Sequence, residues 1–129
     1  MATLKEIIER VEREKPDAFQ SDVKARWLAE LEGKIALDCF AMSHVEAKAL
    51  RYSWPKDEKK ELLISFPNEE IYVLYLEAMI DFHNGEPDRY QNAMERFNQA
   101  FLGFKQWLLM TFGDNPRRYL EMLQEEAAE

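Results

Sequence analysis

The side chains of this chain that could do chemistry are few and lie far apart in the sequence. Cys39, His44 and His83 are the candidates for nucleophilic or metal chemistry. A zinc site needs clustered Cys and His at a regular spacing, and nucleophilic catalysis needs a Ser or Cys set against a His. Ser43 directly precedes His44, but adjacency in sequence is not a catalytic geometry and no motif surrounds the pair. The sequence therefore predicts no catalytic residue and no metal site.

Acidic pairs and glycines give no better basis for an enzyme. Glu69 and Glu70 fit the first turn of a helix, where carboxylates complement the positive end of the helix dipole. Glu125 and Glu126 lie in the acidic C-terminal tail, where we expect them to be solvated. The four glycines lie far apart, whereas a phosphate-binding loop needs closely spaced glycines. We expect no cofactor and no enzyme activity; a rival enzyme with an unfamiliar acidic site would need perturbed carboxylates inside a pocket.

Length and composition favour one domain, spanning residues 1–129. Hydrophobic residues make up 47% of the 129, enough to bury a core without disulfides or metals. The formal net charge of -8 opposes nucleic-acid binding as the main task. The lone Cys39 is expected to be a small buried hydrophobe. The N-terminus lacks the apolar core of a signal peptide, and no run approaches the ~18 apolar residues of a membrane span, so we expect a cytoplasmic protein without membrane contact.

Apolar residues at helical spacing predict an all-α fold, a small bundle of four to five helices. Asn84 and Gly85 end one strongly apolar helix, and Pro87 suits the first turn of the next. Because this connection is short, the two should form a long central antiparallel hairpin. The second of them, about residues 87 to 112, has an apolar stripe at alternating spacings of three and four: Tyr90, Met94, Phe97, Phe101, Phe104 and Leu108. Shorter helices are expected between Thr3 and Pro16, from Ser21 to about Phe40, and after Pro116.

Two segments lack a helical pattern. The inserted loop, about residues 41 to 66, carries a dense run of charges and ends in the short apolar run 62–66 before Pro67. Periodicity leaves open whether that run is a lone strand or an extended stretch laid across the helices. The acidic tail, about residues 124 to 129, is expected to be frayed.

Four aromatic side chains fall outside the core pattern. Trp107 and Phe112 lie partly off the axis of the stripe in 87–112, and Tyr52 and Trp54 stand in the polar loop. Core burial is favoured for each one taken alone, but together they exceed what one small core needs. Aromatic side chains of this kind are enriched at protein interfaces. Tyr52, Trp54, Trp107 and Phe112 are therefore the candidate interface residues.

Several segments together resemble small proteins encoded in the structural gene clusters of tailed bacteriophages and prophages. The matching segments are TLKEII at 3–8, KARWLAELEGKI at 24–35, ELLI at 61–64 followed by Phe66-Pro67, EIYVLYLEAMIDF at 70–82, RYQN at 89–92 and Phe97-Asn98. Proteins of this kind are regarded as head-to-tail connector, adaptor or head-completion proteins. The resemblance implies a helical virion protein that forms a homo-oligomeric ring under the portal, contacts other head or tail proteins and has no catalytic residue.

The charge of the chain agrees with that expectation. A repulsive wall lets DNA pass without specific binding, and net -8 would suit a subunit beside a DNA channel. A ring also needs a heterologous interface, one side of which we expect in the loop from about residue 43 to 60. The alternative is a phage-encoded helical protein-binding module, a regulator or an assembly chaperone, which would use the same aromatic surface to hold one partner.

Overall fold

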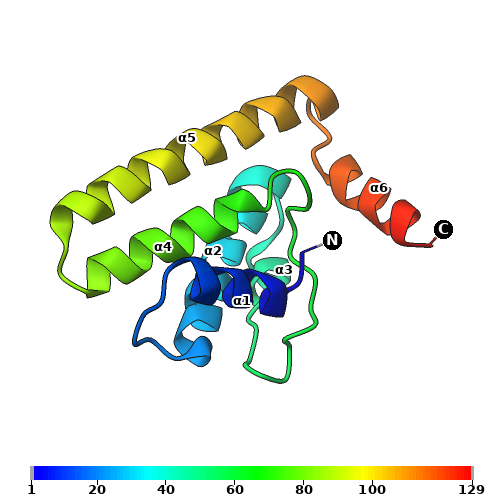
Figure 1. Ribbon diagram of the computed structural model, residues 1–129. Helices are drawn as coiled ribbons and strands as arrows, with labels where there is room; N and C mark the ends of the chain where they lie inside the picture. Colours follow the sequence, from blue (N-terminus) through cyan, green and yellow to red (C-terminus); the bar gives the residue numbers. More distant parts are fainter. Residues whose placement is uncertain (1, 129) are drawn as a thin grey trace.

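The computed structural model describes residues 2–128, which fold into an all-α structure without a strand among them (Figure 1). The helices are α1 (Leu4–Glu14), α2 (Ser21–Phe40), α3 (His44–Lys48), α4 (Glu70–His83), α5 (Pro87–Phe112) and α6 (Arg117–Ala128). The predicted fold class is confirmed. The helix count exceeds the expected four to five because the loop contains the short α3. No helix within residues 2–128 combines the length and apolar character needed to cross a membrane.

The hairpin of α4 and α5 is the centre of the fold, as predicted from the sequence. Gly85 adopts a φ of 70°, left-handed geometry that glycine accepts easily, and so closes α4. α4 is buried on almost every side, because α5 covers one side while α1 and α2 pack against the others. Its buried apolar side chains are Ile71, Tyr72, Val73, Tyr75, Leu76, Ala78 and Ile80.

The N-terminal helix follows the sequence pattern closely. The Thr3 hydroxyl accepts a hydrogen bond from the Glu6 backbone N–H at 3.2 Å and caps α1. The apolar face of α1 is fully buried and consists of Leu4, Ile7, Ile8 and Val11. Residues 58–62 run beside this N-terminus: the Leu4 N–H donates to the Lys60 carbonyl, and the Leu62 N–H to the Ala2 carbonyl, both at 2.9 Å.

The inserted loop is more ordered than its sequence suggested. Ser43 and Glu46 form a capping box that starts α3, a local signal that the sequence carried. The apolar run that follows is not a strand, since the bridge near it is an isolated one between Thr3 and Glu61. Leu62 and Ile64 are nevertheless buried, so the run is an extended stretch laid across the helices.

The acidic tail, for which the sequence predicted fraying from about residue 124, is helical in the residues that the structure describes, and its fraying stays a prediction. Helix α6 continues through Ala128, and residue 129 lies outside the described part. Arg118 explains part of the difference, because its guanidinium contacts Glu121 at 3.2 Å and Glu125 at 2.8 Å. Ion pairs along one helix face add modestly to helix stability, and here they tie the acidic tail to the first turn.

Candidate interaction surface

The second half of α5 extends beyond the helix that covers its first half. α5 has 26 residues and α4 has 14. At about 1.5 Å per residue, α5 is therefore roughly 18 Å longer. Figure 1 shows α5 continuing past the start of α4 toward α6. This end of α5 packs against α6 and, through the rings of Phe104 and Phe40, against the C-terminal end of α2.

Large apolar side chains are exposed at this end of the molecule. Of the eight exposed large hydrophobic residues in the described part of the chain, five lie on α5 and α6, and we call these five the α5–α6 surface: Leu102 (52% exposed), Trp107 (43%), Leu109 (67%), Met110 (86%) and Met122 (40%). Scattered exposed apolar residues are common, but a local concentration on a small protein marks an interaction site. The geometry can bind an apolar partner surface.

Four members of this surface, Leu102, Leu109, Met110 and Met122, were missed in the sequence, although a signal was present for Leu109 and Met110. Residues 107–110 read Trp-Leu-Leu-Met, four apolar residues in succession. Successive residues of an α-helix point about 100° apart, so four in a row cover most of its circumference. In the structure Leu108 faces the core while Leu109 and Met110 face outward.

Tyr119 organises the joint between α5 and α6. Its buried ring has four aromatic neighbours at centroid distances of 5.7 to 6.2 Å, namely Phe40, Phe104, Trp107 and Phe112. The Tyr119 hydroxyl accepts a hydrogen bond from the Ser65 N–H at 2.9 Å. The predicted interface residues Trp107 and Phe112 thus lie together here, each with part of its ring against Tyr119 and part facing solvent.

The other two predicted interface residues lie in the loop, apart from this pair. Trp54 is half-buried against the core, and so is Tyr52. The Tyr52 hydroxyl donates to the Glu32 carboxylate at 3.1 Å, which fixes the loop to α2. The structure therefore distributes the four predicted residues over two places, and their role in an interface stays a prediction.

Glu32 is a buried carboxylate that the sequence did not reveal. Its oxygens accept hydrogen bonds from the Tyr72 hydroxyl at 2.7 Å, from the Leu63 N–H at 2.9 Å and from Tyr52. The Tyr72 hydroxyl in turn accepts from the Ile64 N–H at 2.9 Å. Burial raises the pKa of Glu32 to about 7, although these hydrogen bonds oppose the shift. The network holds residues 52, 63 and 64 to α2 and α4.

An apolar groove lies between α6 and residues 61–63, and we call it the α6 groove. Its volume is about 280 Å³. The apolar side chains that line it are Met42, Leu62, Leu63, Leu120 and Leu123, and the polar ones are Glu61 and Gln124. It shares no lining residue with the α5–α6 surface, so the two features are separate.

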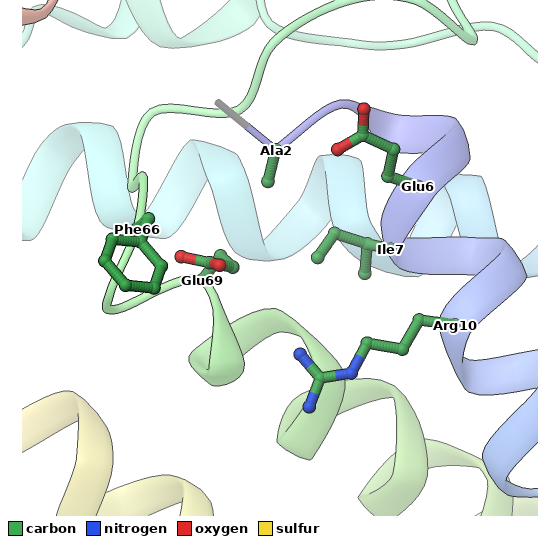
Figure 2. A pocket seen from close by; sticks show the side chains of 6 residues that line it. All are labelled: Ala2, Glu6, Ile7, Arg10, Phe66 and Glu69. Atoms are coloured by element: carbon green, nitrogen blue, oxygen red, sulfur yellow. The ribbon is translucent and has the colours of Figure 1, made fainter.

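A more polar hollow of about 220 Å³ lies beside α1 (Figure 2). It is lined by Ala2, Glu6, Ile7, Arg10, Phe66 and Glu69. The Arg10 guanidinium is engaged by Glu14 and Glu70, and the Phe66 ring is largely exposed at the rim. Glu69 Oε2 is shielded from solvent and has no hydrogen-bond partner within residues 2–128. The hollow brings carboxylates near a guanidinium but pairs no nucleophile with a base, so we assign it no reaction.

The remaining candidates for chemistry stay apart in space. Cys39 is buried, and burial raises the pKa of its thiol to about 11, which suppresses thiolate reactivity. The His83 ring stacks on Trp27 with a centroid distance of 4.9 Å. Within residues 2–128, no three His, Cys, Asp or Glu side chains are grouped to hold a metal ion.

Compared with known proteins, this chain matches no family model, no curated protein and no solved structure.

Proposed function

We propose that this chain is a structural virion protein, a head-to-tail connector subunit of a tailed bacteriophage or prophage that assembles into a ring under the portal. The observation that carries the proposal is the α5–α6 surface, which leaves Leu109 and Met110 largely in water in the isolated subunit. An exposed apolar concentration of this kind supports a protein that works by binding other proteins. The resemblance of its segments to phage connector proteins supports the specific role.

The distribution of charge supports the same role. Residues 62–88 contain six acidic side chains and neither Lys nor Arg. Three of the six, Glu70, Asp81 and Glu86, form ion pairs with Arg10, Lys15 and Arg89 of the same chain. The rest of this stretch keeps a negative field, which repels a polyanion and would let DNA pass through a ring without sticking.

The test is the mass of the purified protein in solution, alone and mixed with the portal protein encoded in the same gene cluster. Light scattering should detect ring-sized species or a complex with portal. The double variant Leu109→Ser/Met110→Ser should lose assembly while keeping its helical circular dichroism. Phe82→Ser is the matched control, because Phe82 is 55% exposed at the opposite end of the α4–α5 hairpin.

A negative result is equally informative. A stable monomer or dimer that ignores portal and every other virion component would contradict the connector proposal. The phage-encoded regulator or assembly chaperone would then become the better explanation of the α5–α6 surface.

A further inference from the structure

We infer that the exposed Leu109 and Met110 of one subunit dock into the α6 groove of a second copy of this chain. This inference rests on the proposed function and specifies the contact between neighbouring subunits. It makes the interface heterologous, with one face of each subunit bound to a different face of the next.

The protruding half of this contact is apolar, and Lys105 supplies a positive charge beside it, with Asp38 lining the same hollow. Leu109 and Met110 are the two most exposed large hydrophobic residues of α5. Lys105 lies one helical turn before Leu109 and is exposed, with its ammonium over the Phe101 ring at 5.1 Å. The ion pairs formed within residues 2–128 do not include Lys105.

The receiving half is apolar and carries one negative charge. Five aliphatic side chains line the α6 groove, and Glu61 is its only charged lining residue. Glu61 is exposed and also takes no part in the ion pairs of the described residues. A neighbouring subunit that inserts Leu109 and Met110 into the α6 groove can bring its Lys105 to Glu61. Apolar side chains then contact apolar side chains, and the two opposite charges pair. Charge matching of this kind fixes register at interfaces.

A second copy is the occupant that these observations favour, because both complementary halves occur on one chain. They also share no lining residue: Leu109 lines a separate hollow with Asp38, Cys39 and Pro116, none of which lines the α6 groove. A subunit can therefore use its groove and its protruding residues at the same time. Repeating such a contact generates a closed ring when the rotation closes.

Charge reversal tests the predicted pair in the assembling protein. Lys105→Glu and Glu61→Lys should each weaken assembly roughly tenfold, since each places like charges together. The double variant, with both charges exchanged, should recover assembly to within about twofold of the wild type. Lys34→Glu is the control, because Lys34 is exposed on α2 and lines neither feature. Sedimentation velocity over a concentration series measures the assembly of these four variants and of the wild type.

Disulfide trapping gives an independent readout of the apolar contact. Met110→Cys and Leu123→Cys are prepared as separate proteins, assembled together and oxidised, and the covalent dimer is quantified on a non-reducing gel. Native Cys39 can stay in place because its thiol is buried with a raised pKa. The mixture should give a covalent heterodimer, whereas Phe82→Cys mixed with Leu123→Cys should not.

The outcomes separate this inference from the function it rests on. Assembly without cross-linking, and without recovery in the double charge variant, would overturn the contact while the connector proposal stands. Failure of the wild type to assemble either alone or with portal would overturn both.

Discussion

The two halves of α5 show how one helix can have opposite roles in the same molecule. In the first half, Ala93 and Phe97 are buried, with the Phe97 ring 5.2 Å from Tyr75 of α4. The second half is richer in apolar residues, and although Phe104 and Leu108 are buried there, Leu102, Leu109 and Met110 are exposed. The difference arises from α4, which is too short to cover the whole of α5. Where a neighbouring helix ends, apolar side chains that would belong to a core become available to a partner.

The largest expected effect on stability comes from replacing a leucine by alanine, once in the buried helix α4 and once in the exposed second half of α5. Leu76→Ala should destabilise the protein by about 2–5 kcal/mol, because Leu76 is fully buried in α4 and its loss leaves a cavity. Leu109→Ala should change the free energy of unfolding by less than about 0.5 kcal/mol, because its side chain is mostly in water. Urea denaturation of both variants measures the contrast. Equal losses would show that the end of α5 is packed in solution and would remove the basis of the comparison.

The next largest effect is the pH dependence of folding stability, which arises from the buried residue Glu32. The pKa of Glu32 is about 7 in the folded protein against 4.5 for the ordinary carboxyl. The folded state therefore binds this proton more tightly than the unfolded state. Stability contributed by the proton is fully present below about pH 4.5 and is lost as pH rises through 7. At 1.36 kcal/mol per pKa unit, the loss approaches roughly 3 kcal/mol.

Glu32→Gln tests this assignment, because the amide keeps the shape of the side chain but does not titrate. Wild-type protein should lose stability between pH 5 and pH 8, and the variant should lose much less over that range. Urea midpoints at each pH give the comparison, and exposed Glu30 on the same helix supplies the control variant Glu30→Gln. A wild-type profile that rises toward pH 8, or one that Glu32→Gln leaves unchanged, would contradict the raised pKa.

A smaller effect on stability is expected at Tyr119, in the joint between α5 and α6. Tyr119→Phe keeps the aromatic ring among Phe104 and its neighbours but removes the acceptor for the buried Ser65 N–H. An unsatisfied buried donor costs about 1–3 kcal/mol. Hydrogen exchange should show the Ser65 amide losing protection along with the first turn of α6. Loss confined to α6, with Ser65 still protected, would mean that another group accepts this hydrogen bond.

The sequence predicted those features that depend on local pattern. The α4–α5 hairpin followed from Asn84, Gly85 and Pro87 together with the apolar stripes on both sides. These signals act over a few residues, so they persist whatever the rest of the chain does. The capping box of α3 was of the same local kind, but its helix of five residues was too short to leave a periodic pattern.

Features that depend on distant partners could not be predicted. Glu32 reads as one more charged residue of α2, and its partners Tyr52 and Tyr72 lie 20 and 40 residues further along the chain. Nothing local distinguishes it from a solvated glutamate. The exposed Leu109 and Met110 form an intermediate case: the run at 107–110 showed that some apolar residues must face away from the core, but which ones depended on where α4 begins.

The smallest expected effect concerns two neighbouring arginines of α6. Arg117 joins α6 to other parts of the chain, whereas Arg118 pairs within α6. Arg117 donates from Nε to the Phe40 carbonyl at 3.1 Å, and its terminal nitrogen donates to the Ala41 carbonyl and the Glu46 carboxylate, both at 3.0 Å. A lysine keeps the charge but cannot reproduce this fork. Because the side chain is partly exposed, Arg117→Lys should cost about 1 kcal/mol or less.

The matched control is Arg118→Lys, because the ion pairs that Arg118 forms within residues 2–128 are with Glu121 and Glu125 of its own helix. Thermal denaturation should show a lower midpoint for Arg117→Lys than for Arg118→Lys, since only the first loosens α6 from the end of α2. The same loosening would widen the α6 groove, so the Arg117 variant should also weaken assembly more than the Arg118 variant does. If both lysine variants behaved alike, the attachment of α6 would rest on the Tyr119 cluster alone, and the groove would keep its shape without the arginine.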